Sequence, residues 1–242
     1  MPIFRKKPAP KQEILRPDES FRHIAFIMDG NGRWAKKRNM PREYGHKAGA
    51  ETMRKISTYC HEIGFKAITV YAFSTENWKR PKHEVDAIMD LLDSFLAELM
   101  RDHEKYRNRI RFIGDTSVLT PSLKEKIAYA ESLNPDSDRI INIALNYGGR
   151  AELVHAFNTL AADGKTEVTE EDISAALYTR ESGDPDMIVR TGGDLRISNF
   201  LLWQAAYAEL YFTEKLWPDL STEDVDDMVR SFYSRKRRYG GL

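Results

Sequence analysis

The chain has 242 residues, and its 37 Lys and Arg against 37 Asp and Glu give a formal net charge of zero at pH 7. Hydrophobic residues make up 41% of the chain and charged residues 31%, a balance typical of a globular protein and not of a disordered one. The single cysteine, Cys60, excludes an internal disulfide framework and a zinc site built from several cysteines.

Apolar segments and charge suggest where the protein acts. The apolar runs are far shorter than the roughly 18 residues of a membrane span, and the N-terminus lacks the apolar segment of a secretory signal, so we expect a cytoplasmic protein. Residues 1–55 carry 14 basic and 6 acidic side chains, whereas residues 163–227 carry 5 and 16. A basic segment can meet phosphates, anionic lipid or nucleic acid, or simply be a solvated surface. Zero net charge argues against nucleic-acid binding.

The predicted elements alternate along the chain. Residues 1–20, rich in proline and charge, predict a flexible N-terminal arm. Short apolar runs then predict buried strands at 23–28, 67–73, 110–113, 140–145, 187–189 and 209–212. Helical patterns lie between these runs, at 84–106, 122–133 and 152–160, and Thr169 and Ser221 precede acidic residues as helix N-caps do. This alternation predicts an α/β fold in which residues 21–242 form a single domain, with a mostly parallel central sheet and flanking helices.

Ligands of open parallel sheets bind beyond the carboxyl ends of the strands. The segments that follow the predicted strands are rich in glycine, arginine, carboxylates and amides. They are 29–33, 74–80, 146–150 and 190–198.

The segment Asp29–Arg33 suits phosphate binding, because glycines let backbone N–H groups approach an anion. It also matches the dinucleotide fingerprint G-x-G-x-x-A, but the next strand ends more than 40 residues later, where the fingerprint expects an acid about 20 residues on. Asp29 would repel a bare anion and fits better as a ligand of Mg²⁺, which bridges carboxylate and diphosphate oxygens. A simple strand-to-helix turn is the alternative.

Arginines and an apolar helix complete the pattern. Five arginines could grip phosphate groups, or could serve only solubility, and His46 is either a participant or a structural residue. No Walker A motif and no zinc-hydrolase motif is present. The apolar arc of 84–106 is wide, as expected for a helix that faces the sheet and also lines an apolar cavity. The five arginines are Arg33, Arg42, Arg80, Arg190 and Arg196.

Several long motifs together resemble the cis-prenyltransferase family, and within it the bacterial undecaprenyl diphosphate synthases. The motifs are HIAFIMDGNGRWA at 23–35, GHKAG at 45–49, AFSTENWKR at 72–80, NYGGR at 146–150 and RTGGDLRISNFLLWQ at 190–204. The resemblance covers the chain from about residue 20 to its end. It implies a homodimer whose sheet and helices enclose a hydrophobic tunnel. It also implies Mg²⁺-dependent, repeated cis addition of isopentenyl diphosphate to farnesyl diphosphate, which supplies the lipid carrier for cell-wall polysaccharides.

Carried over by position, the resemblance implies that Asp29 and Asn77 are catalytic and that Asp29 and Glu209 hold the metal. Asn77 would be the proton acceptor, although a carboxamide is a very weak base, and orienting isopentenyl diphosphate while a departing diphosphate oxygen takes the proton is physically easier. The residues implied to bind or border the substrates are Gly30, Asn31, Gly32, Arg33, Trp34, Arg42, His46, Ser74, Thr75, Glu76, Trp78, Arg80, Arg190, Arg196, Ile197 and Ser198.

The resemblance leaves three further expectations. The basic tail includes Arg238-Tyr239-Gly240, similar to an element that reaches the isopentenyl site across the dimer. For the basic N-terminal arm, the expectation is contact with anionic membrane where a lipid product leaves. A shorter-chain synthase and a non-catalytic subunit of the same fold are the alternatives, and Asp29, Asn77 and their neighbouring arginines argue against the second.

Overall fold

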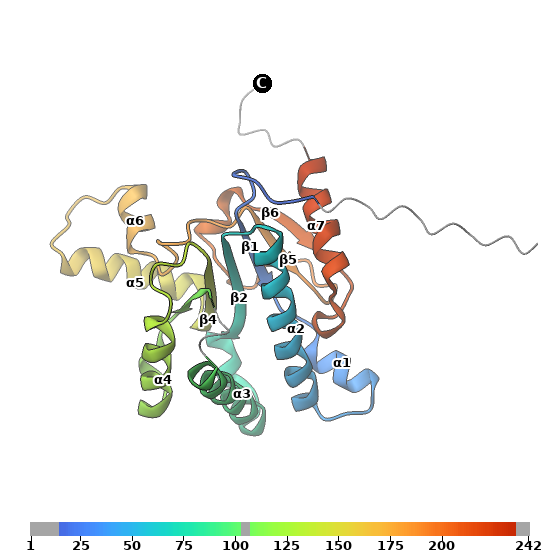
Figure 1. Ribbon diagram of the computed structural model, residues 1–242. Coiled ribbons are helices and arrows are strands. Elements are labelled where there is room, and N and C mark those ends of the chain that lie inside the picture. The colour runs from blue at the N-terminus through green and yellow to red at the C-terminus, as the bar shows by residue number, and fades with distance from the viewer. Residues whose placement is uncertain (1–14, 103–106, 236–242) are drawn as a thin grey trace, which may run out of the picture.

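The computed structural model describes residues 15–102 and 107–235. A single six-stranded sheet in the order β3-β4-β2-β1-β5-β6 forms its centre, and every neighbouring pair of strands is parallel (Figure 1). The strands are β1 (His23–Ile27), β2 (Ala67–Ser74), β3 (Arg109–Ile113), β4 (Ile140–Tyr147), β5 (Met187–Arg190) and β6 (Glu209–Phe212). The α/β fold with a parallel sheet is therefore confirmed, and each predicted strand lies within two residues of an observed one.

Helices connect the strands and cover the sheet (Figure 1). The predicted helix at 84–106 begins two residues earlier, and its described part ends at Arg101, so residues 103–106 lie outside the described structure. Thr169 and Ser221 form the capping boxes that the acidic first turns predicted. The helices are α1 (Asn31–Lys37), α2 (Arg42–Ile63), α3 (Lys82–Arg101), α4 (Pro121–Ser132), α5 (Gly149–Ala162), α6 (Glu170–Ala176) and α7 (Thr222–Ser234).

The longest of these helices, α2, was not predicted as an element. Its sequence contains Gly45 and Gly49, which weaken the helical signal. The structure explains Gly45, because a Cβ there would lie 2.0 Å from the Asn31 backbone oxygen. The glycine therefore lets α1 pack directly on α2, and this packing sets the path of the loop after β1.

The two faces of the sheet have separate cores, as expected for strands whose side chains alternate in direction. Ile24 and Phe26 of β1 belong to a large cluster with residues of α2, α3, α4 and α7. Ala25 and Ile27 belong to a smaller cluster with Phe200 and its neighbours. Strand β1 is buried on both faces along its whole length, so it can hold the residue that follows it in a fixed position.

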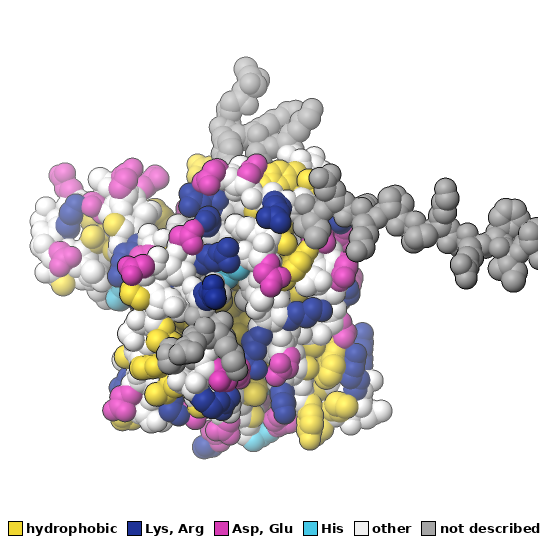
Figure 2. Space-filling view, viewed as in Figure 1, with side chains coloured by type: hydrophobic (Ala, Val, Ile, Leu, Met, Phe, Trp, Pro, Cys, Tyr) yellow, Lys and Arg dark blue, Asp and Glu magenta, His cyan; other side chains and the backbone are white. Residues whose placement is uncertain are grey.

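The surface of the described chain is mixed in charge, and its N-terminal residues pack on the last helix. Lys and Arg are interspersed with Asp and Glu on the face drawn in Figure 2. Asp18 N–H donates to the Tyr233 hydroxyl at 2.9 Å, and Phe21 stacks on Phe232, which ties residues 18–21 to α7. No helix in the described ranges is long and apolar enough to cross a membrane. Residues 1–14 of the predicted N-terminal arm and the 236–242 tail lie outside the described residues.

Candidate active site

The loops at the carboxyl ends of the strands meet around a cavity of about 630 Å³, which we call the head pocket. Residues of the motifs at 23–35, 45–49, 72–80 and 190–204 are thereby brought together, although they are up to 170 residues apart along the chain, whereas the motif at 146–150 does not line this cavity. Residues lining the head pocket are Ile27, Met28, Asp29, Gly30, Asn31, Gly32, Arg33, Arg42, His46, Tyr71, Ala72, Ser74, Glu76, Asn77, Arg80, Arg190, Ser198 and Asn199.

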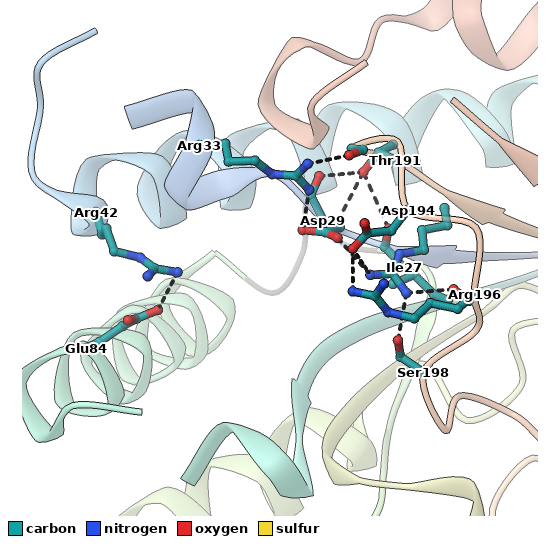
Figure 3. A network of polar contacts seen from close by, with 11 residues as sticks. Ile27, Asp29, Arg33, Arg42, Glu84, Thr191, Asp194, Arg196 and Ser198 are labelled. Atoms are coloured by element: carbon teal, nitrogen blue, oxygen red, sulfur yellow. Dashed lines mark hydrogen bonds and ion pairs between the residues drawn. The ribbon is translucent and has the colours of Figure 1, made fainter. Parts of the chain in front are cut away.

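Asp29 lies where β1 ends, and two arginines hold its carboxylate (Figure 3). Arg190 contacts Oδ2 at 2.9 Å and Arg33 contacts Oδ1 at 3.0 Å. Burial alone would raise the pKa of Asp29, but the hydrogen bonds from Arg190 and Arg33 outweigh it and keep the pKa below its usual value. Asp29 is therefore ionised at neutral pH.

The next residue, Gly30, has a backbone conformation that favours glycine, with φ +111°. A Cβ there would lie 2.8 Å from Leu216 Cδ2 and 3.1 Å from Leu216 Cα. Any side chain at this position would push the loop away from the Leu216 backbone. Gly30 thus keeps the turn after Asp29 tight.

Arg190 is the buried centre of the network, with 5% of its surface exposed. Its guanidinium donates to the Arg196 backbone oxygen at 2.6 Å and to Ser198 Oγ at 2.7 Å, and it contacts Asp194 at 2.9 Å. Arg196 reaches the same Asp194 oxygen at 2.6 Å. Ser198 and the two residues Asn199 and Leu201 have positive φ angles, so this loop is strained in the way that functional loops often are.

A second cluster surrounds Glu84 on α3, whose side chain is 2% exposed. Its Oε1 atom contacts Arg80 at 3.0 Å, Arg42 at 3.3 Å and His46 Nε2 at 3.3 Å. Desolvation lowers the pKa of His46, and the hydrogen bond that His46 donates to Glu84 only partly opposes this shift. The Arg42–Glu84 pair is set apart from the Asp29 network (Figure 3), so cations approach the head pocket from two sides.

Asn77 belongs to a short 3-10 helix, η1 (Thr75–Lys79), that directly follows β2. Its Oδ1 atom accepts a hydrogen bond from Ser74 N–H at 3.1 Å, which completes a capping box. Trp78 Nε1 donates to Asn146 Oδ1 at 2.8 Å, and this bond fastens η1 to the C-terminal end of β4. Asn77 is thus held at the pocket wall with its oxygen already engaged.

The head pocket borders an apolar cavity of about 450 Å³ between α2, α3 and the sheet. Four residues, Met28, Asn31, His46 and Ala72, line both spaces. Helix α3 contributes Ile88, Leu91, Leu92 and Phe95 to the apolar cavity, and the sheet contributes Phe73, Ile143 and Leu145. The wide apolar arc expected of this helix therefore faces a cavity as well as the core.

Most predicted site residues line the head pocket, and others lie at its edges. Thr75 Oγ1 would be 3.0 Å from a Cβ at Gly148, and Ile197 packs against the smaller core cluster. Trp34 points elsewhere: its Nε1 donates to Asp219 at 2.7 Å, and Arg38 lies 3.9 Å from its ring centroid. Trp34 thus lies in a cluster with Asp219 and Arg38.

Glu209 lies apart from Asp29 in this chain. It begins β6 and is level with Met187 and with Ile24 in the strand register. Strand β1 continues for three residues beyond Ile24, about 10 Å, and Asp29 lies past its end. The Glu209 carboxylate pairs with Arg235 at 2.6 Å. Within one chain, the structure therefore places the two predicted metal ligands toward opposite ends of the strands.

Sequence reasoning missed the roles of several residues that the structure places at the site. The buried Thr191 donates from its Oγ1 to the Asp29 backbone oxygen at 2.7 Å and accepts from Asp29 N–H at 3.1 Å. Asn199 bridges the loops by donating to Glu76 at 3.1 Å. Glu84 stands four residues after Arg80, and that spacing was the one available signal. An acid in the first turn of a helix is common, however, and the spacing alone would not have singled it out.

The residues fit Mg²⁺ only together with a phosphate ligand. Within the described part of the chain, no group of three or more His, Cys, Asp or Glu side chains could hold a metal ion. Asp29 supplies one carboxylate, with the cations of Arg33 and Arg190 beside it. Mg²⁺ commonly binds through one or two carboxylates plus substrate phosphates and water, and this donor set suits that mode.

Known proteins share this sequence and fold. A family model described as "Putative undecaprenyl diphosphate synthase" matches residues 27–240. An isoprenyl transferase of Fusobacterium nucleatum is 49% identical over 224 residues, covering 91% of this chain and 96% of its own. One of Thermotoga maritima is 45% identical, with 91% and 97% covered.

Two solved structures have the same fold. Lavandulyl diphosphate synthase from Lavandula x intermedia, in complex with dimethylallyl diphosphate, has a TM-score of 0.84 at 33% identity, covering 92% of this chain and 100% of its own. A protein described as a probable undecaprenyl diphosphate synthase from Campylobacter jejuni has a TM-score of 0.77 at 36% identity, covering 91% and 98%. The chain therefore belongs to the cis-prenyltransferase family, among the isoprenyl transferases of the undecaprenyl diphosphate synthase type.

Proposed function

We propose that the protein is a Mg²⁺-dependent enzyme that adds isopentenyl diphosphate repeatedly, in cis, to farnesyl diphosphate. The product would be undecaprenyl diphosphate, the precursor of the lipid carrier for cell-wall polysaccharides. The observation that carries the proposal is that the head pocket and the apolar cavity are adjacent and share Met28, Asn31, His46 and Ala72 as lining residues. A substrate with a diphosphate head and a growing hydrocarbon tail needs both spaces side by side.

The arginines of the head pocket are numerous enough to suit two diphosphate groups. Arg33 and Arg42, with the backbone of the Gly30 loop, would bind the allylic diphosphate, and Arg190, Arg196 and Ser198 would bind isopentenyl diphosphate. Planar guanidinium groups bind phosphate oxygens in pairs. The contacts between these arginines and carboxylates keep the cations in place before the substrates enter.

Asp29 would hold Mg²⁺ together with the diphosphate oxygens. The bound ion supplies charge stabilisation for the leaving diphosphate. Arg33, which contacts the same carboxylate, would donate to the developing negative charge on that diphosphate.

In the reaction, C4 of isopentenyl diphosphate forms a bond to the allylic carbon as the allylic C–O bond breaks. Loss of a proton from C2 then makes the new Z double bond. Asn77 would orient isopentenyl diphosphate, because its oxygen is engaged with Ser74 N–H and an amide is a very weak base. An oxygen of the departing diphosphate would take the proton.

We also propose that the enzyme is a homodimer of the cytoplasm. Val154 and Phe157 on α5 are 60% and 61% exposed, and Leu195 and Tyr207 are 76% and 77% exposed. Large apolar side chains at this exposure favour burial against another subunit. The basic N-terminal residues, outside the described ranges, would contact anionic membrane where the lipid product leaves.

The test is to incubate the purified protein with farnesyl diphosphate, labelled isopentenyl diphosphate and Mg²⁺, and to measure the size of the products. We expect a C55 product that disappears on addition of EDTA. Shorter products would keep the chemistry and refute the undecaprenyl assignment. A folded protein that makes no product, with or without detergent, would refute the enzyme and favour a non-catalytic subunit.

A further inference from the structure

Helices α2 and α3 are joined by ion pairs at two separate places, and the apolar cavity lies against the stretch between them. The first place is the head pocket, where Glu84 of α3 contacts His46 of α2 at 3.3 Å. The second joins Arg54 of α2 to Glu98 of α3 at 2.6 Å. Both Arg54 and Glu98 line the apolar cavity.

The second pair lies well away from the head pocket. From His46 to Arg54 the rise along α2 is about 12 Å, and from Glu84 to Glu98 the rise along α3 is about 21 Å. On the α3 side, the cavity wall between the two pairs consists of Ile88, Leu91, Leu92 and Phe95, with Ser94 as its one polar side chain. A chain that grows from the head pocket along this wall would therefore meet Arg54 and Glu98 after a run of apolar contacts.

The surroundings of Arg54 fix its position over the cavity. Its guanidinium also contacts Glu51 at 3.3 Å and lies 5.7 Å from the centroid of the Phe95 ring. Within residues 15–102 and 107–235, its Nε atom is shielded from solvent and has no hydrogen-bond partner. The Arg54 and Glu98 side chains are only 30% and 31% exposed, so the charges stand at the edge between the cavity and solvent.

We propose that Arg54 and Glu98 are specificity-determining residues that limit the length of the hydrocarbon tail. A hydrocarbon that advanced past them would have to separate the pair and strip water from two charges, which is costly. The tail therefore stops at the pair, while the ion pair keeps α2 and α3 from parting. This inference rests on the proposed function, because it concerns the length of that reaction's product.

The test compares product sizes from the wild type, Glu98→Leu, Arg54→Met and the double variant. The changes remove the charges and continue the apolar wall, so we expect the product distribution to move to longer chains by at least one five-carbon unit. The largest shift is expected in the double variant. Arg54→Lys keeps the charge opposite Glu98 and should keep the wild-type length.

Asp93→Leu is the matched control. Asp93 also lies on α3 and pairs at 2.6 Å with Lys126 of α4, but it does not line the apolar cavity. This variant loses an interhelical ion pair and gains a leucine as Glu98→Leu does, so it should leave product length unchanged. Circular dichroism and thermal unfolding would be measured for every variant, and Glu98→Gln replaces Glu98→Leu if that variant does not fold.

The outcomes separate this inference from the proposed function. If the wild type makes no polyprenyl product, the proposed function fails. If the wild type makes product and the folded Arg54 and Glu98 variants give the same sizes, the length-limiting role is refuted. An equal shift in Asp93→Leu would also refute it, because the effect would then come from general loosening of α3.

Discussion

The head pocket and the apolar cavity are adjacent, but they are built in opposite ways. The head pocket takes short segments from the ends of several strands, and its charged groups contact one another as Asp29, Arg33 and Arg190 do. The apolar cavity takes side chains along the length of two helices, of the same types that fill the core. We infer that the chemistry depends on a few positions fixed by buried strands, whereas product size depends on a long surface on which many side chains share control.

The largest effect is expected at Asp29. Asp29→Asn removes the carboxylate that would hold the metal and leaves Arg33 without its anion, so turnover should fall by about 10²–10³-fold or more. Steady-state rates with labelled isopentenyl diphosphate measure this, and the residual product should keep its wild-type length. A variant within tenfold of the wild type would show that the head pocket does not depend on this carboxylate.

Two leucines one turn apart on α3 test whether the wall of the apolar cavity differs from the core. Leu96 is fully buried in the core, whereas Leu92 is partly buried and lines the apolar cavity. Leu96→Ala should cost about 2–5 kcal/mol of unfolding free energy, with product length unchanged. Because Leu92 already borders the apolar cavity, Leu92→Ala should lower the free energy of unfolding by less than Leu96→Ala does, and it should change product length.

Urea unfolding and product sizing check this pair of variants. Equal losses of stability with equal product lengths would mean that the cavity wall behaves as ordinary core. The wild-type chain, unfolded under the same conditions, provides the reference for both.

These leucines also explain what the sequence could and could not predict. The strands and the head-pocket residues could be predicted, because their apolar runs and the glycines and arginines after them are distinctive at short range. Leu92 and Leu96 have the same spacing pattern, and only packing distinguishes a cavity wall from a core. Glu84, Thr191 and Glu209 depend on which strands and helices become neighbours, and no local pattern carries that information.

Two buried histidines that line neither the head pocket nor the apolar cavity should make the stability of the protein depend on pH. Burial lowers the pKa of His23 and of His61 to about 4. The hydrogen bonds of His23 suit a neutral ring, with Nδ1 3.0 Å from Gly183 O and Nε2 2.8 Å from Thr69 Oγ1. Because the folded pKa lies below the unfolded value near 6.5, stability is complete above pH 6.5 and falls as the pH drops toward 4.

At pH 5 the expected loss is about 2 kcal/mol for each of these histidines relative to pH 7.5. Urea unfolding at the two pH values measures it. His61→Gln removes one of the two contributions, so the loss between pH 7.5 and pH 5 should be about 2 kcal/mol smaller than in the wild type. An equal loss in both proteins would mean that His61 is already protonated in the folded state at pH 5.

The smallest effect is expected at Thr191, which positions Asp29 without touching the pocket. Thr191→Val keeps the shape of the side chain but removes the hydroxyl that bonds to the Asp29 N–H and C=O. Each of these groups keeps another partner, since the N–H also donates to Ile27 O at 2.9 Å and the oxygen also accepts from Trp217 N–H at 3.0 Å. We therefore expect kcat to fall about tenfold, the equivalent of about 1.4 kcal/mol, with the KM for isopentenyl diphosphate nearly unchanged. Thr191→Ser should restore the rate, because it retains the hydroxyl. A Thr191→Val variant with wild-type kcat would show that burial of β1 alone orients Asp29. The fixed geometry that distinguishes the head pocket from the apolar cavity would then come from the strands and not from the loop after β5.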